Sequence, residues 1–136
     1  MNKQPLYITK IVKRIGYLVV LEFSNGERRF IDFKQYLQKH KTQQNKILLE
    51  SEKAFAKIKL NETTVYWPNT ARKIDEFIDY YNPDPEVIYK ESKPLTLEYT
   101  QEFYKLLRKY STKIKEKYQR KQPDLISFSK TVSALF

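Results

Sequence analysis

The chain has 136 residues, enough for one domain or for one small domain with an appended helical segment. It contains no cysteine, which excludes disulfides and thiolate metal sites and favours a reducing cytoplasm. The net charge of +10, from 26 Lys and Arg against 16 Asp and Glu, suits a nucleic acid or an acidic protein as partner, or merely solvated basic faces. The longest apolar run, Tyr17 to Leu21, is too short to span a bilayer, and Met1 to Lys10 lack a signal-peptide core. We therefore expect a cytoplasmic protein with no membrane segment.

Three strands are predicted at the start of the chain, over Tyr7–Lys13, Tyr17–Ser24 and Glu27–Phe33. Gly16 is expected in the turn between the first two strands. Asn25-Gly26 favours a two-residue type I′ turn between the second and third, because both central residues of that turn need a positive φ.

This turn would set the register of the hairpin. It places Glu22 opposite Arg29 and Val20 opposite Ile31. One face would then carry Leu18, Val20, Ile31 and Phe33, and the other Val19, Leu21, Phe23 and Phe30. Both faces are apolar near Tyr17, so we expect other segments to cover both sides of the sheet there.

Short elements are predicted next. Helices are expected from Phe33 to about His40 and over Ser51–Ala56, with Ser51 as N-cap. The polar residues Lys39–Asn45 indicate a loop between them. Brief strands are expected over Ile58–Leu60 and Thr63–Trp67.

Pro68 is expected to stop the last of these strands, because proline has no N–H to donate. A helix is then predicted over Lys73–Tyr81, where apolar residues recur at helical spacing, with Asn69 as its cap. Asp75 and Asp79 would share one face of that helix. They could hold a divalent cation, or simply balance nearby basic residues, which is the interpretation we favour.

In their order and spacing these segments resemble the bacterial domain-of-unknown-function 2442 family over about residues 6–90. The matching segments are Phe23–Glu27, Ile31–Phe33, Phe55–Ile58, Val65–Ala71 and Pro85–Tyr89. The resemblance implies a small α+β domain and a non-enzymatic accessory or regulatory protein. Some members are joined to DNA-binding segments, and others are encoded beside a second small protein in toxin–antitoxin-like pairs. The chain differs from the family at Thr70 and Arg72, and by the inserted residues Lys73–Tyr81.

We divide the chain into an α+β domain, residues 1–92, and a basic helical extension, residues 93–136. A long amphipathic helix is predicted from Thr96 until Pro123 ends it. Its apolar stripe consists of Tyr99, Phe103, Leu106, Leu107, Tyr110, Ile114 and Tyr118. The last residues, Asp124–Phe136, are rich in apolar side chains and are expected to form a helix or a docked tail.

The opposite face of this helix is basic. Its candidate phosphate-binding residues are Lys105, Arg108, Lys109, Lys113, Lys117, Arg120 and Lys121. A solvated outer face is the alternative that we favour. Nothing in the pattern favours base-specific recognition.

No group of residues has the pattern of a catalytic site. His40 is the only histidine, no serine lies in a nucleophile context, and neither glycine belongs to a phosphate-binding loop. We therefore predict that the chain is not an enzyme and needs no metal or other cofactor.

Trp67 is best interpreted as a core residue, although it could also anchor an interface or stack on a base. With Asn69 and Tyr89 it forms a candidate partner-binding set. The leading hypothesis is a protein-binding adaptor or antitoxin-like regulator, whose partner is a small protein encoded nearby. The alternative is a nucleic-acid-binding protein that contacts phosphates through its basic C-terminal helix.

Overall fold

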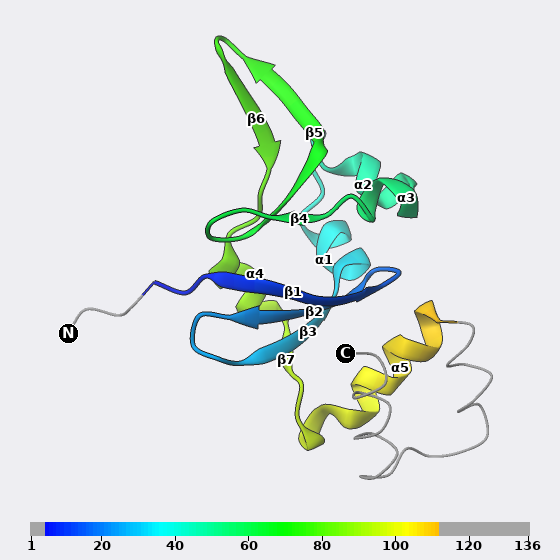
Figure 1. Cartoon of the computed structure of the whole chain (residues 1–136). Coiled ribbons are helices and arrows are strands. Elements are labelled where there is room, and N and C mark those ends of the chain that lie inside the picture. The colour runs from blue at the N-terminus through cyan, green and yellow to red at the C-terminus, as the bar shows by residue number, and fades with distance from the viewer. Residues whose placement is uncertain (1–4, 112–136) are drawn as a thin grey trace.

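The computed structural model describes residues 5–111 and shows an α+β fold, which confirms the predicted class (Figure 1). The strands are β1 (Ile8–Ile15), β2 (Leu18–Phe23), β3 (Arg28–Asp32), β4 (Lys59–Leu60), β5 (Val65–Ile74), β6 (Phe77–Tyr81) and β7 (Lys93–Pro94). The helices are α1 (Phe33–Lys39), α2 (Lys46–Glu50), α3 (Glu52–Phe55), α4 (Pro85–Glu91) and α5 (Thr100–Tyr110), with a 3₁₀ turn, Leu97–Tyr99, before α5. The strands form two antiparallel sheets, in the orders β1-β2-β3-β7 and β4-β5-β6.

The turn between β2 and β3 is one residue longer than predicted. The Phe23 N–H donates to the Glu27 carbonyl, and the Gly26 N–H donates to the Phe23 carbonyl, each at 2.9 Å. Gly26 has a φ of +86°, whereas Asn25 keeps a negative φ and accepts the Glu27 N–H on its side-chain oxygen. The connection is therefore a three-residue loop that ends on a left-handed glycine, and the predicted type I′ turn is wrong.

The longer loop moves the register by one residue. The observed pairs are Leu18 with Asp32, Val19 with Ile31, Val20 with Phe30, Leu21 with Arg29 and Glu22 with Arg28. The predicted pair of Glu22 with Arg29 is therefore wrong, and Glu22 forms an ion pair with Arg28 at 3.1 Å. Because side chains alternate between faces, the shift exchanges the faces of Phe30 and Ile31.

Both faces of the main sheet are covered, as predicted, and each carries its own core. Leu18, Val20 and Phe30 pack against Phe103, Tyr104 and Leu107 of α5. The opposite face packs against α1, α2, α3, α4 and the first residues of β5, through Val19, Leu21, Phe23, Ile31, Phe33, Leu37, Leu48, Phe55, Val65, Trp67 and Ile88. The sheet is thus the middle layer of three.

Capping residues explain where the short helices begin. Asp32 accepts the N–H of Lys34 at the start of α1, and Ser51 accepts the N–H of Ala54 at the start of α3, as expected for that serine. Asn45 is fully buried and closes the loop after α1, because its side chain bonds to Thr42 and to the His40 carbonyl.

The C-terminal helix is shorter than predicted. α5 ends at Tyr110, because the backbone of Ser111 is extended, with φ −129° and ψ 108°. Ile114, Tyr118 and the rest of the predicted helix lie outside the described residues, as does the expected segment Asp124–Phe136. β7 follows the expected domain boundary at residue 92 directly and pairs with β3 in the main sheet.

Candidate interaction surfaces

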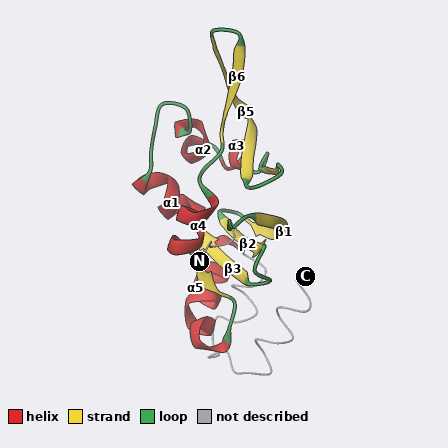
Figure 2. Cartoon of the chain, turned by 90° about the vertical axis from the view of Figure 1, so that its left-hand side faces the viewer, coloured by secondary structure: helices red, strands yellow, loops and turns green. Residues whose placement is uncertain are grey.

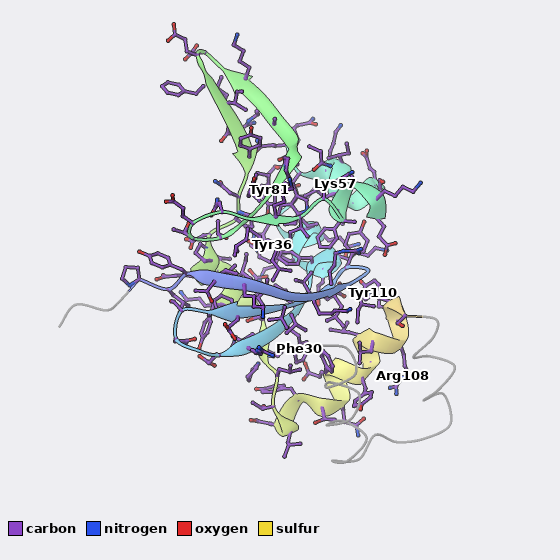
Figure 3. The ribbon with its side chains drawn as sticks, in the orientation of Figure 1. Phe30, Tyr36, Lys57, Tyr81, Arg108 and Tyr110 are labelled. Carbon is purple, nitrogen blue, oxygen red and sulfur yellow. The ribbon has the colours of Figure 1, made fainter. Side chains whose placement is uncertain are left out.

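Trp67 belongs to the core, which is the role that we favoured from the sequence. It is therefore not available to a partner. Its side chain is fully buried, and its indole N–H donates to the Phe55 carbonyl at 2.8 Å. Its ring stacks on Tyr81 at 5.5 Å and meets Phe33 edge-on at 5.7 Å. Tyr36 lies beside this cluster, and burial is the main reason why the pKa values of Tyr36 and Tyr81 are raised (Figure 3).

The other two candidate partner residues lie apart from Trp67. Asn69 is exposed, but its amide donates to the Ala54 carbonyl at 3.1 Å; it caps no helix, so that prediction is wrong. The Tyr89 hydroxyl donates to Glu27, and the Arg29 guanidinium lies 4.0 Å from the Tyr89 ring centroid. The hydrogen bond to Glu27 raises the pKa of Tyr89, and the same bond lowers the pKa of Glu27. The three candidates therefore do not form one surface.

β5 does not stop at Pro68, and the helix predicted over Lys73–Tyr81 does not form. Instead β5 and β6 make a hairpin that stands out from the rest of the molecule in both views (Figures 1 and 2). Between the pairs Trp67–Tyr81 and Arg72–Asp79, β5 has four residues and β6 has one. Pro68 falls in this irregular stretch, where no regular ladder bond is needed from it.

Thr70 closes the ladder at this irregularity. Its hydroxyl donates to the Trp67 carbonyl at 2.6 Å and accepts the Tyr81 N–H at 2.9 Å. The Gln44 amide lies 3.2 Å from an Asp79 carboxylate oxygen and 3.4 Å from the Thr70 carbonyl. These bonds fix the base of the hairpin to the body.

Residues 72–79 form the projecting end of the hairpin, which we call the arm. Arg72 pairs with Asp79 at 2.9 Å, Lys73 lies opposite Ile78, and Ile74 lies opposite Phe77. The turn consists of Asp75 and Glu76, and Asp75 has a φ of +54°, which aspartate tolerates better than most residues. Asp75 and Asp79 thus share no helical face, and the premise of a cation site there is wrong.

Apolar side chains of the arm face solvent on both sides. Phe77 is 76% exposed, Ile78 62% and Ile74 46%. Because partners in an antiparallel pair share a face, Ile74 and Phe77 lie on one side and Ile78 on the other. Such exposed apolar surface on a projecting element marks a candidate docking site.

A second candidate surface is a groove of about 860 Å³ between α1 and α5, beside β3 and β7. Its lining residues, which define the basic groove, are Phe30, Ile31, Asp32, Lys34, Gln35, Gln38, Glu91, Lys93, Glu102, Lys105, Leu106 and Lys109. Of the predicted phosphate-binding residues, Lys105 and Lys109 line it. Arg108 lies on α5 outside this lining (Figure 3), and Lys113, Lys117, Arg120 and Lys121 are outside the described residues.

Asp32 connects the two walls of this groove. Besides capping α1, its carboxylate accepts the Tyr110 hydroxyl at 2.7 Å and pairs with Lys109 at 3.3 Å. Burial and then the bond to Asp32 raise the pKa of Tyr110. Neither role of Asp32 was predicted from the sequence, although aspartate is a residue type common at helix N-caps.

Comparison with family models, with curated proteins and with solved structures finds no match for this chain. Among residues 5–111 no helix is long and apolar enough to cross a membrane. The same residues contain no group of three or more His, Asp or Glu placed to hold a metal ion. The arm and the basic groove are therefore the features from which a function is inferred.

Proposed function

We propose that this protein is a non-enzymatic protein-binding adaptor or antitoxin-like regulator, and that the arm is the part it inserts into its partner. The observation that carries the proposal is the exposure of Phe77 and Ile78 on opposite faces of one projecting hairpin. Burying two such side chains stabilises a complex by about 3 kcal/mol, at roughly 25 cal/mol per Å² of apolar area. Cross-strand pairing holds the arm in shape before binding, so little conformational entropy is lost on association.

The arm also indicates the chemistry of its partner. Apolar side chains on both faces fit a cleft that encloses the hairpin better than a flat surface that meets one face. Asp75 and Glu76 at the tip place negative charge at the deepest point of insertion. The floor of the cleft is therefore expected to be basic, whereas nucleic-acid phosphates or anionic lipids would repel the tip.

The resemblance of residues 6–90 to the domain-of-unknown-function 2442 family suits this class of function, because it implies an accessory or regulatory protein, and some members are encoded beside a second small protein. In this chain the inserted residues, Lys73–Tyr81, include all of the arm except Arg72. We accordingly place partner contact on the arm instead of on Trp67.

The experiment starts from the tagged full chain recovered from its native host at moderate salt. The co-purifying protein is identified and produced separately, and its Kd is measured by calorimetry against two variants. Phe77→Ser/Ile78→Ser should weaken binding about 100-fold, since each 1.4 kcal/mol is a factor of ten. Ile47→Ser/Leu97→Ser, which removes two other exposed apolar side chains (41% and 57%), should bind within about twofold of wild type.

Equal weakening by both variants would show that general surface hydrophobicity, not the arm, drives association. Wild-type affinity in the arm variant, or no co-purifying protein, would overturn the proposal. Thermal unfolding of each variant checks that the fold is retained.

A further inference from the structure

The basic groove brings together lysines from three separate elements. Lys34 lies on α1, Lys93 on β7 and Lys105 on α5, and all three line the same cavity. Lys105 and Lys109 follow Glu102 at i+3 and i+7, so one face of α5 forms a wall. This convergence depends on the packing of α5 on the sheet, and it involves none of the arm residues.

Two of the three acids in the groove are already neutralised within the chain. Asp32 pairs with Lys109 at 3.3 Å, and Glu91 pairs with His40 at 2.6 Å and with Lys39 at 3.5 Å. Glu102, the third acid, forms no ion pair with residues 5–111.

Within residues 5–111, no carboxylate compensates the charges of the three lysines in the groove. Lys34, Lys93 and Lys105 form no ion pair with a carboxylate among residues 5–111. Within residues 5–111, three lysines without an ion pair thus face one acid without an ion pair, Glu102, so the groove carries an excess of positive charge, and its concave shape concentrates that field.

We propose that this groove binds the phosphate backbone of a single-stranded nucleic acid. Lysine ammonium groups act as point charges toward phosphate and make sequence-independent contacts. The lysines come from three elements that line the groove, so they can contact successive phosphates of one strand. A groove of about 860 Å³ has room for a few nucleotides of one strand.

The test measures binding of the full chain to a fluorescein-labelled uridine oligonucleotide of about 15 nucleotides. Fluorescence anisotropy is recorded between about 50 and 200 mM salt. Lys34→Gln/Lys93→Gln/Lys105→Gln should weaken binding at least tenfold and reduce the slope of log K against log salt by about 2, since each phosphate contact contributes about 0.7 for single strands. Glu102→Gln should strengthen binding, because it removes the uncompensated acid.

The matched control is Lys46→Gln/Lys53→Gln/Lys57→Gln, which makes the same change in net charge at three exposed lysines on or near α2 and α3. Lys57 lies far from α5 (Figure 3), so this variant should bind within about twofold of wild type. Equal weakening by both triple variants would show that net charge alone drives binding, and it would overturn the proposal that the groove is the binding site. A duplex of the same length bound as tightly as the single strand, or no binding at low salt, would also overturn the proposal. Unfolding midpoints of the variants show whether any loss comes from misfolding.

Discussion

α5 and the arm use apolar side chains in opposite ways. In α5, Phe103, Tyr104 and Leu107 are turned onto the sheet and fully buried, and lysines occupy the outer positions. In the arm, Phe77 and Ile78 point away from the body and make no part of either core. The helix is therefore part of the folding unit, whereas the apolar surface of the arm is left exposed to solvent. Substitutions in the two regions should separate stability from binding.

The largest effect on stability is expected at the base of the arm. Trp67→Ala should lower the free energy of unfolding by about 3–5 kcal/mol, because it removes a fully buried indole and its bond to Phe55. Phe77→Ala, at the other end of the same hairpin, should change it by less than about 0.5 kcal/mol. Urea unfolding followed by circular dichroism measures both. A comparable loss in the two variants would mean that the arm takes part in the folding core.

Asp32→Ala should come next, with a loss of about 2–3 kcal/mol, because the cap of α1 and both contacts to α5 disappear together. Asp32→Asn keeps a capping side chain and should lose about half as much. Limited proteolysis should cut α5 faster in the alanine variant than in wild type. Unchanged cleavage would show that the sheet contacts alone hold the helix.

Gly16→Ala should cost about 2 kcal/mol. Gly16 has a φ of +59°, and a Cβ there would lie 2.9 Å from the Cβ of Tyr110, so the substitution strains the turn and displaces the end of α5. Gly26 has a φ of +86° but open space around it, so Gly26→Ala should cost only the backbone strain, about 1 kcal/mol. A Cβ at Gly16 would also lie 2.9 Å from Glu52 Oε1, so the difference between the unfolding free energies of the two variants reports the contacts with Tyr110 and Glu52 together. Equal losses of unfolding free energy in the two variants would show that close contacts at Gly16 do not contribute.

The smallest effect is a pH dependence at alkaline pH. The folded state raises the pKa of Tyr110 above the ordinary value of 10.0. The neutral phenol is thus favoured on folding, so its contribution to stability is complete below pH 10 and is lost as pH rises above 10. Tyr110→Phe should show a shallower decline of unfolding free energy above pH 10 than wild type.

The prediction of strands and helices from the sequence succeeded where local chemistry decides the structure and failed where packing does. Ser51 and Gly16 have the residue types that a cap and a turn require, and they lie as expected. The spacing of apolar residues in 74–81 fits a helix as well as the spacing in α5 does. Only α5, however, meets an apolar sheet face, whereas β-branched and aromatic residues in 77–81 pair readily as a strand.

The surfaces divide in the same way. The sequence predicted that Lys105 and Lys109 lie on a basic helix face. Lys34 and Lys93 lie far from them in sequence and line the same groove only because α5 packs on the sheet. The exposure of Phe77 was not predicted, because residues 73–81 were expected to form a helix with an apolar stripe that includes Phe77. The loop at Asn25-Gly26 is likewise one residue longer than predicted, so Phe30 and Ile31 lie on the opposite faces from those predicted.

The closed ladder at Thr70 has a consequence for protein engineering. Trp67 and Tyr81 remain stacked, and Thr70 remains bonded to both of their backbones, whatever lies beyond them in the hairpin. Changing the length of the connection alters its closure entropy only slowly. Residues 73–78 can thus be treated as an exchangeable cassette that leaves the Arg72–Asp79 pair and the Gln44–Asp79 contact in place, so that hairpins of other sequence and length can be grafted onto the same scaffold to direct it to chosen targets.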